Sequence, residues 1–121
     1  MDIRDTLSRM SLREKIDLCE GHDFWHTRAF KKHGIGAVMM CDGPHGLRKQ
    51  TAASDMLGVN SAVPATCFPT AVAAGCSWDP ELCAAIGKAI AEEARANEVS
   101  LVLGPGLNIK RNPLCGRNFE Y

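Results

Sequence analysis

The sequence predicts an α/β fold with a parallel sheet, built as one small domain. An apolar run at 37–41 ends in the turn tripeptide Asp42-Gly43-Pro44, which is typical of a strand buried on both faces. A second apolar run at 100–103 closes on Gly104-Pro105-Gly106, and a helical pattern over about 80–97 lies between the two runs. Strand, helix and strand in this order are typical of a parallel sheet. With 121 residues, 45% of them hydrophobic, the chain can build one such core.

The amino-terminal third is predicted to contain one short helix followed by irregular chain. Ser11 and Glu14 form a capping-box pattern, so we expect a helix over about 12–20 that stops at Gly21. The segment 27–32 is expected to add another helical turn. Residues 48–63 have no sustained periodicity and are predicted to be a loop, and loops of this length are often functional.

A third apolar stretch, at 70–76, is interpreted as another strand whose direction in the sheet is left open. Asp79 and Pro80 then form an N-cap with proline at the first helical position, and Asn97 is expected to end the helix that they start. The apolar face of this helix is expected to bury three side chains against the strands: Leu82, Ile86 and Ile90.

Charge and composition exclude several classes of partner. Fourteen basic residues balance fourteen acidic ones, so the chain has no net field to attract nucleic acid or a membrane surface. The charged start has no apolar signal region, and no apolar run is long enough to span a bilayer. Six cysteines are spread along the chain, several of them in apolar runs, which predicts reduced and mostly buried thiols in a cytoplasmic protein rather than disulfides.

Nucleotide and metal sites find little support. The segment 104–109 (GPGLNI) has Ile109 where a dinucleotide motif needs its third glycine, and no phosphate-loop motif is present. His22 and His26 could share a helical face, but no third ligand accompanies them at a zinc-like spacing. No cofactor and no metal are therefore expected.

Three segments carry most of the functional information: DGPHGLR at 42–48, FPTAVAAGCSWDPEL at 68–82, and LGPGLNIKRNPLCGRNFEY at 103–121. In this order and at this spacing they resemble the amino-terminal domain of glycoside hydrolase family 3, the β-glucosidase kind. The resemblance runs from about residue 11 to the last residue. It implies that residues 1–121 are the amino-terminal portion, about the first half, of a (β/α)₈ barrel that is incomplete in this chain.

The resemblance also implies four substrate-binding residues. In the family, an Asp at the end of the first barrel strand holds two hydroxyls of the terminal sugar, and Asp42 matches it. Arg48 and Arg111 match further sugar-binding arginines, while Arg117 is expected to play a supporting role, such as orienting Glu120. These residue types suit a pyranose, because a carboxylate accepts two hydroxyl hydrogen bonds while an arginine donates to the sugar oxygens.

Plainer roles remain open for the same residues. Asp42 also fits a simple turn cap, and Arg111 and Arg117 also fit solvated charges or ion-pair partners of Glu98 and Glu120. A tryptophan beside a strand is usually part of the core, so two residues are assigned to packing: Trp25 and Trp78.

The resemblance implies a retaining β-glucosidase that removes terminal β-D-glucosyl or β-xylosyl residues from a β-glucoside or oligosaccharide. Retention needs a carboxylate nucleophile and a second carboxyl group about 5–5.5 Å away, and neither is assigned within this chain. We therefore expect an inactive fragment of a longer enzyme that carries part of the glycone subsite. The alternative is a non-catalytic sugar-binding or self-assembling fragment, and its open strand edges favour self-association or pairing with the rest of the enzyme.

Overall fold

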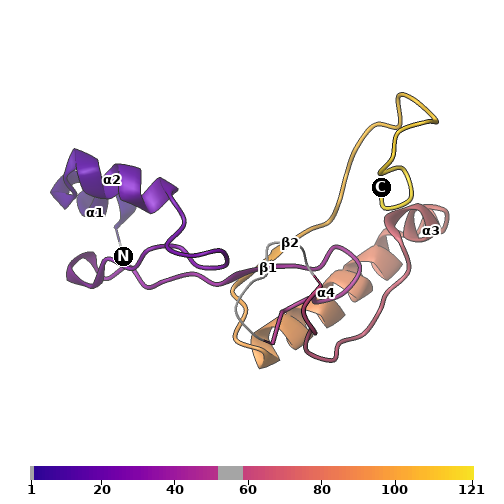
Figure 1. The fold of residues 1–121 in the computed structure, drawn as a ribbon, viewed down its shortest axis with the longest axis horizontal. Helices are drawn as coiled ribbons and strands as arrows, with labels where there is room; N and C mark the ends of the chain where they lie inside the picture. Colours follow the sequence, from indigo (N-terminus) through magenta and orange to yellow (C-terminus); the bar gives the residue numbers. More distant parts are fainter. Residues whose placement is uncertain (1, 52–58) are drawn as a thin grey trace.

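The computed structural model describes residues 2–51 and 59–121 and shows a mixture of short helices and strands. In chain order the elements are α1 (Ile3–Arg9), α2 (Leu12–Cys19), the 3₁₀ turn η1 (Lys31–His33), β1 (Met40–Asp42), α3 (Ala71–Gly75), α4 (Pro80–Ala96) and β2 (Leu101–Leu103). Helices α1 and α2 lie at one end of the molecule, away from α4 and the strands (Figure 1). None of the helices in the described ranges is long and apolar enough to cross a membrane.

The predicted strand, helix and strand unit is present. β1 and β2 pair in parallel, with Met40 opposite Leu101 and Asp42 opposite Leu103, and α4 runs beside them (Figure 1). β1 starts later than the predicted 37–41 run, because Val38 pairs with Thr27 instead: the Thr27 amide donates to the Val38 carbonyl at 3.0 Å. Only Cys41 of β1 is fully buried, so the strand is not covered on both faces along its length.

Helix α4 begins and ends where its caps predict. The Asp79 carboxylate accepts from two amides of the first turn, Pro80 follows it, and Asn97 is the C-cap. Ile86 and Ile90 are half-buried, but Leu82 is 44% exposed, so its predicted burial is wrong. A helix of 17 residues is about 25 Å long, whereas a strand of three residues spans about 10 Å. The strands therefore cannot cover the whole length of the helix.

The predicted strand at 70–76 is a helix. Ala71–Gly75 form α3, whose N-cap is Thr70, with its hydroxyl accepting from the Ala73 amide. Periodicity alone cannot separate a short buried strand from a helical segment. Here the alanine-rich composition and the threonine cap favour the helix.

The helix predicted over about 12–20 is confirmed, whereas the helical turn predicted over 27–32 is only partly present. The capping box of Ser11 and Glu14 is formed in both directions, and α2 ends with Glu20 as its C-cap, one residue before the predicted Gly21. The turn predicted over 27–32 is displaced to η1, which ends on the left-handed Gly34. Helix α1 was not predicted; the carboxylate of Asp2 caps it.

The buried core is small. Within the described residues its main cluster consists of Cys41, Leu47, Ala94 and Val99, with Met39, Val63 and Val102 packed against it, and Met10 is buried elsewhere. All six cysteines are unpaired, as predicted, but only Cys41 is buried, so the prediction of mostly buried thiols is wrong. A core this small has too little interior to cover the others.

The two tryptophans differ in environment. Trp25 is half-buried and its ring meets Phe24 edge-to-face at 4.8 Å between centroids, which agrees with a packing role. Trp78 is 92% exposed, so its assignment to the core is wrong.

Of the predicted loop at 48–63, residues 52–58 lie outside the described residues, and the segments flanking them pair through Gln50 and Ala62.

Candidate functional site

The loop at 42–48 turns back on itself at the end of β1. The Arg48 amide donates to the Asp42 carbonyl at 2.9 Å, which places the two predicted residues side by side. The turn depends on glycine, because Gly43 and Gly46 have φ angles of 156° and 131°, which side-chain-bearing residues rarely adopt. The sequence therefore forms this loop through its two glycines.

Asp42 is the last residue of β1, and its side chain is exposed. Among the described residues we find no hydrogen bond to its carboxylate, so the turn is closed by the Asp42 backbone and not by its side chain. The carboxylate also affects its neighbour. Burial raises the pKa of the Cys41 thiol, and the adjacent negative charge of Asp42 raises it further.

A second segment forms a wall behind the loop. The Thr66 carbonyl lies directly against Gly46, so that a Cβ atom added at Gly46 would stand 2.1 Å from the Thr66 oxygen. The Phe68 amide donates to the His45 carbonyl at 2.7 Å. The 42–48 loop therefore packs against the segment around Thr66.

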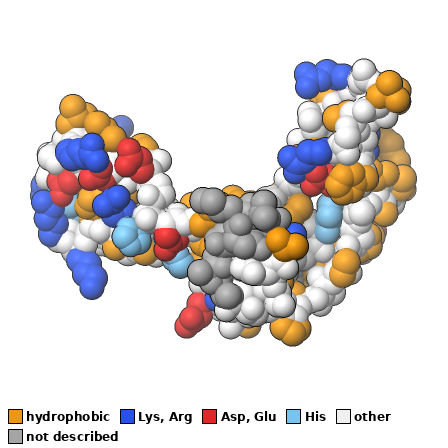
Figure 2. Space-filling view, in the orientation of Figure 1, with side chains coloured by type: hydrophobic (Ala, Val, Ile, Leu, Met, Phe, Trp, Pro, Cys, Tyr) orange, Lys and Arg blue, Asp and Glu red, His pale blue; other side chains and the backbone are white. Residues whose placement is uncertain are grey.

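These segments line a hollow of about 680 Å³ at the carboxyl ends of the two strands. Its polar lining comes from the 42–48 loop, the Thr66 segment and the end of the chain: Asp42, His45, Arg48, Thr66, Arg117, Glu120 and Tyr121. The carboxy-terminal segment rises from the centre of the molecule as an arm that carries charged side chains (Figure 2). The hollow therefore joins parts of the chain that are more than 70 positions apart.

Arg117 and Glu120 form an ion pair at the edge of this hollow. The hydrogen bond from Arg117 lowers the pKa of the Glu120 carboxyl, and the charge interaction with His45 lowers it further. The same hydrogen bond raises the pKa of Arg117. The Arg117 guanidinium also lies 5.3 Å from the centroid of the Tyr121 ring, which packs against Gly106 after β2. The pairing of Arg117 with Glu120 fits both the supporting role and the simple ion pair that the sequence left open.

The structure brings three of the four predicted residues together. Asp42, Arg48 and Arg117 line one hollow, whereas Arg111 is exposed and lies outside that lining. Sequence reasoning missed His45, which lies within the same loop, and Thr66. A signal existed for His45, since it lies inside the DGPHGLR segment, but nothing in the local sequence marks Thr66.

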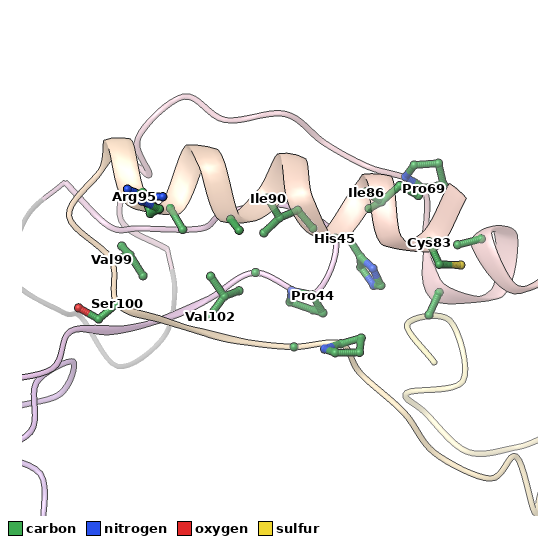
Figure 3. A pocket seen from close by; sticks show the side chains of 18 residues that line it. Pro44, His45, Pro69, Cys83, Ile86, Ile90, Arg95, Val99, Ser100 and Val102 are labelled. Carbon is green, nitrogen blue, oxygen red and sulfur yellow. The ribbon is translucent and has the colours of Figure 1, made fainter. Parts of the chain in front are cut away.

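A second hollow, of about 670 Å³, lies between α4 and the strand ends and differs in chemistry. Ile86 and Ile90 line it from α4, Val102 lines it from β2, and Pro44 lines it from the loop after β1 (Figure 3). Mainly aliphatic walls suit packing better than recognition of a sugar, whose hydroxyls need polar partners. The polar hollow is therefore the candidate site.

The chemistry of the polar hollow is that of binding. A carboxylate beside an arginine can hold neighbouring hydroxyl groups: the carboxylate accepts hydrogen bonds from them, and the arginine donates hydrogen bonds to their oxygens. In the part of the chain that the structure describes, no three His, Cys, Asp or Glu side chains form a group that could hold a metal ion.

Comparison with known proteins finds similarity to glycosidases, the kind of enzyme that the sequence motifs resemble. No model of a protein family matches the chain. Thermostable β-glucosidase B of Acetivibrio thermocellus is 54% identical over 121 residues, which are all of this chain and 16% of that protein. An exo-α-(1→6)-L-arabinopyranosidase of Bifidobacterium longum is 50% identical over 113 residues, covering 93% of this chain and 15% of that protein.

Solved structures agree in backbone as well as in sequence. The family 3 β-glucosidase of Bifidobacterium adolescentis matches 95% of this chain and 15% of its own chain, with a TM-score of 0.80 and 48% identity. β-Glucosidase 3B of Thermotoga neapolitana in complex with glucose matches all of this chain and 19% of its own, with a TM-score of 0.83 and 32% identity. Along its whole length, the chain is therefore similar to one segment of the family 3 glycoside hydrolases named β-glucosidases, and it spans less than a fifth of their length.

Proposed function

We propose that this chain forms part of the glycone subsite of a retaining, exo-acting glycoside hydrolase. The main support for the proposal is that Asp42, Arg48 and Arg117 line one polar hollow at the ends of the parallel strands. Enzymes built on (β/α)₈ barrels place their sites at this end of the strands. The relatives named β-glucosidases, one of them solved with glucose, support a sugar as the ligand.

In this proposal the terminal sugar is held through its hydroxyl groups. Asp42 accepts hydrogen bonds from two neighbouring hydroxyls, while Arg48 donates to sugar oxygens; Arg111 lies outside the hollow and is given no contact with this sugar. Arg117 keeps Glu120 in place at the rim of the hollow. Each hydrogen bond to a charged group is worth about 1.5–3 kcal/mol, and bonds that strengthen as the sugar distorts towards the transition state accelerate the reaction.

The bond-breaking carboxylates belong to another part of the proposed enzyme. The chain covers only 15% and 19% of the two solved structures described above, and we assign no nucleophile within it. We therefore propose that residues 1–121 are the first part of a larger barrel domain, in which β1 and α4 form one strand–helix repeat and β2 begins the next. By itself the chain is expected to have no hydrolytic activity.

Two relatives differ in the sugar that they are named for. One is a β-glucosidase and the other an exo-α-(1→6)-L-arabinopyranosidase, so the feature that they share is a pyranose. We propose β-D-glucosyl or β-xylosyl residues at the non-reducing end as the substrate class.

The experiment is to replace Asp42 in the longer enzyme that contains this chain. Losing two charged hydrogen bonds corresponds to at least about 3 kcal/mol, so Asp42→Ala is expected to lower kcat/KM for an aryl β-glucoside more than about a hundredfold. Asp5→Ala is the control, because Asp5 is an exposed carboxylate of α1 that pairs only with Arg9 on the same helix. An unchanged kcat/KM in Asp42→Ala would remove Asp42 from the site.

A second candidate function is a self-assembling, non-catalytic piece. The chain has an accessible surface of 8810 Å², whereas a compact monomer of 13.1 kDa exposes about 6,400 Å². Several large apolar side chains are almost fully exposed, led by Trp78, Leu114 and Leu107. An excess of this size is comparable to a stable protein interface, which either a second copy or the rest of the enzyme would cover.

A further inference from the structure

We propose that Glu93 is a positioning residue for the sugar subsite, and that it acts through Thr66 on the loop that carries Asp42 and Arg48. This inference rests on the proposed function of that loop. Glu93 lies on the last part of α4, outside the lining of the polar hollow. Its role is therefore to hold the site and not to touch the sugar.

The first link is the contact between Glu93 and Thr66, which are 27 positions apart. The Thr66 amide donates to both carboxylate oxygens of Glu93 at 3.1 Å, and the Thr66 hydroxyl donates to Oε1 at 2.5 Å. Hydrogen bonds to a charged acceptor are stronger than neutral ones. One carboxylate thus fixes both the backbone and the side chain of Thr66.

The second link is steric. The Thr66 carbonyl lies so close to Gly46 that even a methyl group there would stand 2.1 Å from the oxygen. Gly46 is in the middle of the 42–48 loop, whose two ends meet through the bond from the Arg48 amide to the Asp42 carbonyl. A shift of Thr66 therefore removes the wall on which this loop rests.

The third link is the helix itself. The Lys49 ammonium group donates to the carbonyl of Asn97, the C-cap of α4, at 2.7 Å, so the chain just after Arg48 is tied to the same helix end. Glu93 and Asn97 are one turn apart and hold two different segments of the site. A site supported by a regular helix keeps its geometry more precisely than one supported by loops alone.

The test uses the longer enzyme and measures the inhibition constant of glucose together with kcat and KM for an aryl β-glucoside. We expect Glu93→Ala to weaken glucose binding and raise KM by about tenfold, which corresponds to about 1.4 kcal/mol. Glu93→Gln keeps one acceptor oxygen and should fall between Glu93→Ala and the wild type. A residue that served stability alone would lower the amount of folded enzyme without changing the inhibition constant.

The matched control is Glu92→Ala. Glu92 is the neighbouring glutamate on α4, is exposed and pairs only with Lys88 at 3.9 Å, so its loss should leave the inhibition constant unchanged. If Glu93→Ala fails to fold, Thr66 is replaced instead. Thr66→Val removes only the hydroxyl group and should weaken glucose binding. Thr66→Ser keeps the hydroxyl group and should bind glucose as the wild type does.

Two results separate the possible failures. If Asp42→Ala weakens glucose binding but Glu93→Ala, Glu93→Gln and Thr66→Val all bind glucose within about twofold of the wild type, the positioning role is wrong and the proposed function stands. If Asp42→Ala itself leaves glucose binding unchanged, the proposed function is wrong and the role of Glu93 falls with it.

Discussion

Replacing Gly46 by alanine should damage the fold and the candidate site together. Gly46 has a φ angle of 131°, and its Cα atom lies against the backbone of Thr66. An alanine must therefore adopt a strained backbone and also push its methyl group into a carbonyl oxygen. Both effects act on the loop that joins Asp42 to Arg48.

The magnitude follows from these two effects. Backbone strain of this kind costs about 1–3 kcal/mol for a residue with a side chain. An approach of 2.1 Å is well below the 3.0 Å that real Cβ contacts keep, so Thr66 must move, and forced repacking costs about 1–3 kcal/mol more. We expect Gly46→Ala to lower the free energy of unfolding by about 2–6 kcal/mol, a large share of the stability of a small domain.

The assay is urea unfolding of the 121-residue chain, followed by far-ultraviolet circular dichroism, for wild type and variant. Gly36→Ala is the control, because nothing lies within 4 Å of a methyl group at Gly36 and its backbone is not in the left-handed region. This control should be neutral or slightly stabilising. A loss of less than about 1 kcal/mol in Gly46→Ala would refute the close contact with Thr66.

Three further predictions concern the chain itself. Asp79→Ala removes the N-cap of α4 and should lower the free energy of unfolding by about 1 kcal/mol, whereas Asp79→Ser should keep most of it; equal denaturation midpoints for wild type and Asp79→Ala would contradict the cap. The hydrogen bond from Lys32, with those from Ser11, lowers the pKa of Glu14 from 4.5 to about 2. Because this folded-state pKa is depressed, the stabilisation by Glu14 is complete above about pH 5 and is lost as the pH falls towards 2. The difference in urea midpoint between wild type and Glu14→Gln should therefore shrink over that range, and a constant difference would exclude the ion pair with Lys32. Light scattering of the isolated chain should show dimers or larger species, since its exposed surface exceeds that of a compact monomer; a stable monomer at high concentration would mean that the apolar surface is hidden by rearrangement.

Local signals in the sequence predicted two of the capped helices, α2 and α4. The capping box at Ser11 and the Asp79-Pro80 start of α4 are present where they were expected. Each such signal involves groups within four positions of one another, so the local sequence contains everything that the interaction needs. The same locality explains the loop at 42–48, whose glycines allow the turn.

The sequence alone was a poorer guide wherever a segment depends on distant neighbours. The run at 70–76 was read as a strand although it forms α3, and the run at 37–41 gave way at its start to pairing with Thr27. Leu82 follows the apolar periodicity of α4, yet the strands are too short to reach it. For the 37–41 run and for Leu82, the deciding partner is far away in the sequence or absent from the chain's own sheet. The helix at 70–76 instead follows from its alanine content and its Thr70 cap, which periodicity alone does not weigh.

The sequence by itself therefore determined the α/β character of the chain, helices α2 and α4, and its resemblance to family 3 glycoside hydrolases, because those depend on short segments and their order. Only the tertiary structure decided which of the marked residues meet. It brought Arg117 to the hollow beside Asp42 and left Arg111 outside it. It also set Glu93 against Thr66 and Thr66 against Gly46. Those contacts join positions 20 or more residues apart, and no local propensity or spacing encodes them.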